Sequence, residues 1–236
     1  MVRRQIIAMG GGGFSMEPDN LALDRYVLSQ SNAERPAICF LPTASGDADG
    51  YILNFYKAFS TLNCQPTYLS LFHLPTKDLE GYLLAQGILY VGGGNTRSML
   101  ALWREWGVDE IIRKAYAAGV ILAGISAGAN CWFEQCSTDA VPGTLGVVAG
   151  LGLLSGGFCP HYDGEAERRP SLHRMIAEER MPSSYAAENS AAAHFIDEQF
   201  FAAVSSKASA RVYRVWKEGN EVREEAMETR YLMQET

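Results

Sequence analysis

The chain has 236 residues, of which 47% are hydrophobic and 20% are charged, as is usual for a globular protein. Its formal net charge of -7 argues against a nucleic-acid or anionic-membrane surface, because both require clustered lysine and arginine. No apolar run is long enough to span a membrane, and the run at residues 6–9 is too short for a signal peptide. The five cysteines are scattered and odd in number, which favours reduced thiols. We therefore expect a cytoplasmic protein that needs no metal or other cofactor and has no nucleic-acid or membrane partner.

Short apolar runs alternate with amphipathic segments over the first half of the chain. The pattern predicts strands at residues 5–9, 37–41, 66–72, 87–91 and 120–125. Helical spacing predicts helices at residues 47–62, 96–106 and 108–118. This alternation implies a mostly parallel sheet covered by helices on both faces.

The pattern loosens after Thr138, where glycine and proline become frequent. Three later runs, at residues 200–206, 211–216 and 221–227, are typical of antiparallel strands. No linker or internal repeat divides the chain. We therefore expect an α/β fold: a single-domain three-layer α/β/α sandwich over residues 1–236, with a mostly parallel central sheet and antiparallel C-terminal strands.

The stretch 121-ILAGISAGAN-130 places a serine between small residues directly after a predicted strand. It fits the G-x-S-x-G pattern of a nucleophile held on a sharp turn between a strand and a helix. Such a turn requires a strained backbone at the serine and small neighbours that let adjacent chain pass. The alternative is a chance match in a crowded corner, and the strand before Ser126 favours the nucleophile.

Two glycine runs follow predicted strands. The run at residues 10–13 lacks the Lys-Ser/Thr of a phosphate-binding loop, so we interpret it as a tight turn near the site, with nucleotide binding as a minor alternative. The turn 92-GGGN-95 opens a helix and could offer backbone N–H groups to an oxyanion, together with the N–H of Ala127. It could equally be only a tight strand-to-helix turn. We expect Gly94 and Asn95 to contact the substrate.

A nucleophilic serine needs a base, usually histidine, and a group that orients that base. His161 lies in the loop 158-FCPHYDGE-165 and is the best placed of the four histidines, because loops on a rigid scaffold often carry catalytic groups. His194 opens a strand and could be a core residue or the base of another arrangement. The candidate carboxylates are Asp139, Asp163, Glu165 and Glu188. Glu188 lies among small neutral residues, where it is either an orienting group or a turn cap.

Several of these segments together resemble the dipeptidase E/cyanophycinase family of serine peptidases. They are 40-FLPTAS-45, 90-YVGGGNT-96, 124-GISAGAN-130, 160-PHYDGE-165 and the acidic turn at Glu188. The resemblance runs over nearly the whole chain in the same order. It implies a fold similar to class I glutamine amidotransferases, with serine in place of the cysteine nucleophile.

The resemblance also implies roles for single residues. Ser126 would be the nucleophile, His161 the base and Glu188 the third member of the triad, with Asp139 ranked behind Glu188. Gly93 would donate to the oxyanion. The expected activity is hydrolysis of short peptides through an acyl-enzyme, by a monomer or a homodimer.

Aspartyl dipeptidases of the family bind the N-terminal aspartate of the substrate through positive charge near the histidine loop. Arg168 and Arg169 are present there, but they do not align cleanly with the family's arginine. They could bind a substrate carboxylate or form an exposed face with neighbouring glutamates. Two other functions stay open: an α/β-hydrolase esterase that uses Ser126 and His194, and a non-catalytic binding protein on the same scaffold.

Overall fold

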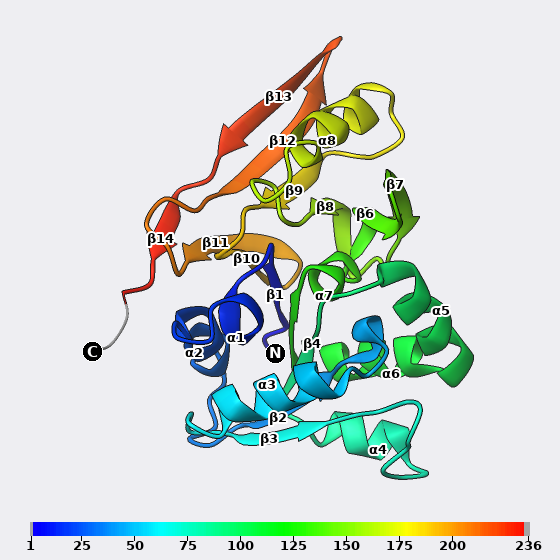
Figure 1. Ribbon diagram of the computed structural model, residues 1–236, viewed down its shortest axis with the longest axis vertical. Coiled ribbons are helices and arrows are strands. Elements are labelled where there is room, and N and C mark those ends of the chain that lie inside the picture. Colours follow the sequence, from blue (N-terminus) through cyan, green and yellow to red (C-terminus); the bar gives the residue numbers. More distant parts are fainter. Residues whose placement is uncertain (1, 234–236) are drawn as a thin grey trace.

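The computed structural model describes residues 2–233, and its centre is an eight-stranded sheet (Figure 1). The strand order is β14-β11-β10-β1-β5-β4-β2-β3. The strands are β1 (Gln5–Met9), β2 (Ala37–Leu41), β3 (Gln65–Tyr68), β4 (Ile88–Val91), β5 (Ile121–Ile125), β10 (Ala191–Ile196), β11 (Gln199–Ser205) and β14 (Thr229–Tyr231). The five strands from β1 to β3 are parallel, whereas β10 runs antiparallel to both β1 and β11.

Helices cover both faces of this sheet, because successive side chains of the parallel strands point in opposite directions. In β1, Ile6 and Ala8 pack with the layer formed by α4 (Leu79–Leu84), α5 (Thr96–Trp106) and α6 (Val108–Ala117). Ile7 and Met9 pack with α1 (Gly13–Met16), α2 (Ala22–Leu28) and α3 (Asp49–Phe59) on the other face. The mixed α/β architecture with a mostly parallel central sheet is therefore confirmed.

Local sequence signals fix the helix boundaries next to the site. The Asn95 side chain caps α5 by accepting a hydrogen bond from the Ser98 N–H at 2.9 Å. Gly107 ends the helix in a left-handed conformation with φ 67°, and α6 begins at the next residue. The N-terminus of α5 is thus held at the end of β4.

A second, six-stranded sheet lies beside the first and is not predicted from the sequence. Its order is β13-β12-β9-β8-β6-β7, and α8 (Arg168–Ala177) packs against it (Figure 1). The strands are β6 (Phe133–Val141), β7 (Thr144–Ala149), β8 (Leu154–Cys159), β9 (Ser184–Ala187), β12 (Val212–Glu218) and β13 (Glu221–Ala226). The three predicted C-terminal strands exist, but they divide between the sheets: β11 joins the first, whereas β12 and β13 join the second.

The two sheets meet where the chain leaves β5 through α7 (Ala127–Asn130) and enters β6. Strand β8 runs parallel to both β6 and β9. The segments that follow β8 and β9 therefore both begin where the carboxyl ends of these strands lie side by side. Residues 2–233 contain no helix that is long and apolar enough to cross a membrane.

Candidate active site

Ser126 stands on a strained turn between β5 and α7. Its backbone has φ 55° and ψ -111°, a region that residues other than glycine seldom adopt. The Ser126 N–H donates to the carbonyl of Met9 at 3.0 Å, and its carbonyl accepts from Ala129 and Asn130 in the first turn of the helix. The side chain is partly exposed, so the hydroxyl at the carboxyl end of the sheet is accessible.

The glycines on either side of Ser126 are required by close backbone contacts. A Cβ on Gly124 would lie 2.2 Å from the carbonyl oxygen of Gly128. A Cβ on Gly128 would lie 2.2 Å from the carbonyl oxygen of Val91 in β4. Helix α7 therefore rests directly on β4 and β5, and only small residues allow this strand-to-helix turn.

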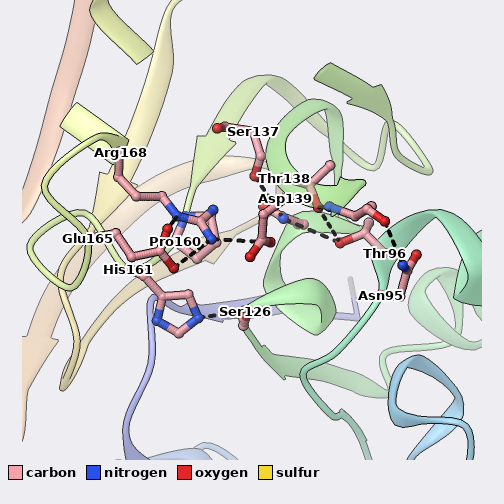
Figure 2. A network of polar contacts seen from close by, with 12 residues as sticks. Asn95, Thr96, Ser126, Ser137, Thr138, Asp139, Pro160, His161, Glu165 and Arg168 are labelled. Carbon is pink, nitrogen blue, oxygen red and sulfur yellow. Dashed lines mark hydrogen bonds and ion pairs between the residues drawn. The ribbon is translucent and has the colours of Figure 1, made fainter. Parts of the chain in front are cut away.

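His161 reaches Ser126 from the loop after β8. Its Nε2 lies 2.9 Å from the Ser126 Oγ, as Figure 2 shows. The His161 backbone is also left-handed, with φ 51°, and its N–H donates to the carbonyl of Gly10 at 3.1 Å. The glycine run after β1 thus anchors the histidine loop opposite the serine.

The other ring nitrogen of His161 contacts an amide, not a carboxylate. Its Nδ1 lies 2.7 Å from Oδ1 of Asn189, which follows β9. Because an amide oxygen can only accept, Nδ1 carries the proton and the Nε2 lone pair faces the serine hydroxyl. The Asn189 N–H in turn donates to Asp163 Oδ1 at 2.7 Å, which ties Asn189 to the histidine loop.

Gly11 leaves the space that the His161–Asn189 pair occupies. A Cβ at this position would lie 2.1 Å from Asn189 Oδ1 and 3.0 Å from His161 Nδ1. The first glycine run therefore serves the histidine pair, and a side chain at Gly11 would push Asn189 away from the imidazole.

Glu188 and Asp139 are the two carboxylates that the sequence favours as triad members. In the structure both of them contact groups other than His161. Glu188 accepts from the backbone N–H of Arg211 at 2.8 Å and from the Tyr213 hydroxyl at 3.0 Å. Asp139 forms an ion pair with Arg168 at 3.2 Å. Sequence reasoning missed Asn189 because it looked only for a carboxylate, although Asn189 directly follows Glu188 in the chain.

The residues expected around the oxyanion lie next to Ser126. Ala127 is the first residue of α7, so its N–H has no acceptor within the helix. Gly93 is close enough that a Cβ on it would lie 3.4 Å from the Ser126 Cβ. Its N–H, however, donates to the Tyr51 hydroxyl at 3.1 Å.

Gly94 and Asn95, expected at the substrate, have contacts within the protein. A Cβ on Gly94, which has φ 138°, would lie 2.1 Å from the carbonyl oxygen of Ala44. Besides capping α5, the Asn95 side chain donates from Nδ2 to the carbonyl of Ala140 in β6 at 2.9 Å. Both residues therefore shape the turn after β4 rather than present a free polar group.

The two arginines differ sharply in exposure. The Arg168 side chain is only 2% exposed and contacts Glu165 through Nε at 3.0 Å and Asp139 through Nη2 at 3.2 Å (Figure 2). It joins the histidine loop to β6 and is not free for a substrate carboxylate. The Arg169 side chain is 44% exposed, and its guanidinium lies 4.7 Å from the Tyr162 ring centroid and 4.8 Å from that of Tyr213.

Replacing Arg168 with alanine should reduce stability without weakening substrate binding. We expect the free energy of unfolding to fall by about 2 kcal/mol, because the charge-assisted hydrogen bonds to Glu165 and the ion pair with Asp139 are lost. Urea denaturation measures this effect, with Arg180→Ala as the control. Arg180 forms an exposed ion pair with Glu178, so its replacement should lower the free energy of unfolding by about 0.5 kcal/mol or less. Unchanged stability with a raised KM would instead identify Arg168 as a substrate ligand.

The buried carboxylate of Asp24 lies against the end of the first glycine run. Asp24 is 0% exposed; it accepts from the Phe14 N–H at 2.8 Å and from the Tyr90 hydroxyl at 3.0 Å. Burial raises the pKa of Asp24 to about 7, although both hydrogen bonds act to lower it. Asp24 thus gains its charge inside the protein at a much higher pH than it does in the unfolded chain.

This raised pKa predicts a pH-dependent loss of stability. Below about pH 4 the carboxyl is protonated in both states, whereas between about 4 and 7 only the unfolded chain ionises readily. Relative to Asp24→Asn, the wild type should therefore lose on the order of 2–4 kcal/mol of unfolding free energy as pH rises through this window. Parallel urea titrations of the two proteins measure the difference, and a constant difference across the window would contradict the raised pKa.

His194, the base of the esterase alternative, is remote from this chemistry. It is 0% exposed within β10, and its Nδ1 bonds to the Tyr26 hydroxyl at 2.7 Å. Burial lowers the pKa of His194 to about 4. It is a neutral core histidine, so the arrangement with His194 as the base is not favoured.

Comparisons with known proteins find similarity to peptidases over most of the chain. The model of peptidase family S51 matches residues 6–203. YgaJ of Bacillus subtilis, an uncharacterised peptidase, is 55% identical over 229 residues, covering 97% of this chain and 99% of that protein. Lmo0363, an uncharacterised peptidase of Listeria monocytogenes, is 30% identical over 142 residues, or 57% of this chain and 69% of its own.

Two crystal structures share the fold at low sequence identity. One is a Listeria monocytogenes EGD-e protein that carries the name peptidase E, with a TM-score of 0.61 and 19% identity over 96% of this chain and all of its own. The other is a peptidase from an acI-B1 actinobacterium, with a TM-score of 0.65 and 14% identity over 95% of each chain.

Proposed function

Because the chain belongs to peptidase family S51 and is a serine-type peptidase, we propose that it hydrolyses short peptides through Ser126, His161 and Asn189. The observation that carries this proposal is the unbroken contact chain Ser126 Oγ–His161 Nε2 and His161 Nδ1–Asn189 Oδ1, at 2.9 and 2.7 Å. Residues 1–236 would form one peptidase domain. In the proposed triad an amide takes the place that the sequence assigns to Glu188.

In the first half of the reaction, Ser126 Oγ attacks the scissile carbonyl carbon while His161 Nε2 takes the hydroxyl proton. Asn189 Oδ1 accepts from Nδ1, which holds the ring in the tautomer that can receive this proton. His161 then protonates the leaving amine, the C–N bond breaks, and an acyl ester remains on Ser126.

In the second half, His161 takes a proton from water, and the resulting hydroxide attacks the acyl ester. This attack gives a second tetrahedral intermediate. Its collapse breaks the bond to Ser126 Oγ, which regains its proton from His161. An amide at Nδ1 adds no negative charge beside the imidazolium. It orients the ring but stabilises the charged form less than a carboxylate would.

Two surface hollows lie beside residues discussed above, and neither is lined by Ser126 or His161. One of about 660 Å³ lies beside the Gly94–Asn95 turn and includes Phe72 and Leu102 in its lining. Another of about 630 Å³ lies beside Asp139 and Glu165. Each volume is in the range of small-ligand pockets.

A dipeptide-library screen tests this function, with Ser126→Ala as the blank. We expect wild-type protein to release free amino acids from some dipeptides and the variant to release none. Peptides with N-terminal aspartate are compared with matched alanine peptides, because one structural neighbour carries the name peptidase E. Turnover that persists in Ser126→Ala would contradict the proposal.

A further inference from the structure

The backbone N–H expected to bind the oxyanion already has a partner. Gly93 donates to the Tyr51 Oη at 3.1 Å. The same glycine borders the nucleophile, since a Cβ on it would lie 3.9 Å from the Ser126 Oγ. The Tyr51 hydroxyl is therefore bonded to the backbone N–H of the glycine that borders the nucleophile.

Packing prevents the Tyr51 ring from moving away when a substrate binds. Its centroid lies 5.4 Å from the Phe14 ring and 5.1 Å from the Phe40 ring. A Cβ on Gly92 would lie 2.9 Å from Tyr51 Cε1, so the backbone also closes on the ring. The torsion of the O–H bond is the freedom that remains to this side chain.

The hydroxyl is also suited to donate a hydrogen bond. Burial raises the pKa of Tyr51 above its ordinary value, so the phenol keeps its proton at neutral pH. Its oxygen accepts from Gly93, and such a bond strengthens the donor character of the O–H group.

We propose that Tyr51 is a catalytic residue, whose hydroxyl donates a hydrogen bond to the oxyanion of the tetrahedral intermediate. This inference rests on the proposed function of the Ser126 site. The Ala127 N–H supplies the second hydrogen bond, and Gly93 acts through Tyr51 by holding and polarising its oxygen. The proton stays on Tyr51 throughout, so the hydroxyl stabilises charge and transfers none.

The test is Tyr51→Phe, which removes only the hydroxyl and keeps the ring packing. We expect kcat to fall by about 10²-fold with KM nearly unchanged, because the lost hydrogen bond forms only in the transition state. Affinity for a peptide aldehyde, which forms a tetrahedral adduct with serine, should fall by a similar factor. Tyr56→Phe, on the same helix but packed against Phe55 and Tyr68, is the control and should keep full activity.

The outcomes separate this inference from the proposed function. A folded wild type that hydrolyses no peptide would contradict the proposed function. If the wild type is active and Tyr51→Phe has the same or a higher kcat, the catalytic role of Tyr51 is wrong, whereas the proposed function stands. In that case the Gly93 N–H is the donor to the oxyanion, and the Tyr51 hydroxyl only occupies it in the free protein. Urea denaturation of both variants checks stability, and a stability loss with unchanged kcat and aldehyde affinity would likewise reject the catalytic role.

Discussion

Ser126→Ala and His161→Ala are each expected to lower kcat for peptide hydrolysis by about 10⁴–10⁶-fold. The serine cannot attack without a base, and the base has no function without the serine, because Nε2 and Oγ share one proton at 2.9 Å. The double variant should therefore be no slower than the worse single variant. Steady-state kinetics on the best dipeptide of the screen measures this non-additivity.

The control for this pair is His73→Ala, which removes an exposed histidine. It should leave kcat within about twofold of the wild type, as is usual for surface substitutions. If the effects of Ser126→Ala and His161→Ala multiply in the double variant, the two residues act independently and the proposed contact has no catalytic meaning.

Asn189→Ala is expected to lower kcat by about 10²–10³-fold, because Nδ1 loses its acceptor and the imidazole can adopt the unproductive tautomer. Glu188→Gln is the matched control, since a glutamine of the same length can still accept from the Arg211 N–H, while its NH₂ group can donate to the Tyr213 hydroxyl. It should change kcat by less than about fivefold. The reverse order of effects would restore Glu188 as the orienting residue.

Asn189→Asp gives the same pair a pH signature. A carboxylate at Nδ1 stabilises the imidazolium by its negative charge, whereas the neutral amide of Asn189 does not. The base is active when neutral. The acid limb of the kcat/KM profile should therefore move to higher pH in this variant. A profile that superposes on that of the wild type would show that position 189 does not face the ring.

The sequence contains enough to predict the nucleophile's half of the site. An apolar strand before Ser126 and small residues on both sides are local features, and the structure explains them by the close contacts of Gly124 and Gly128. The alternation of strands and helices up to residue 125 likewise reflects burial on both faces of the first sheet. These signals depend on neighbours in the chain and can be read without the fold.

The other half depends on contacts that the sequence does not encode locally. Strands β6 to β9 mix buried with half-buried and exposed positions, so their apolar pattern is weak, and the second sheet could not be predicted from it. Glu188 and Asn189 are adjacent in the chain, and only the fold decides which of them contacts His161. Asn189 faces Gly11 and His161, whereas Glu188 faces Tyr213 in β12. Tyr51 lies 42 residues before Gly93 in the chain, and its link to the oxyanion side appears only when α3 packs against the sheet.

Covalent labelling is the most direct measurement of whether position 126 is an activated nucleophile next to the imidazole of residue 161. The folded wild type is incubated with a fluorophosphonate and analysed by intact mass and peptide mapping. We predict one phosphonyl group per chain on Ser126, none on Ser126→Ala, and much slower labelling of His161→Ala. A folded wild type that stays unlabelled, or carries the label at another residue, would contradict the assignment.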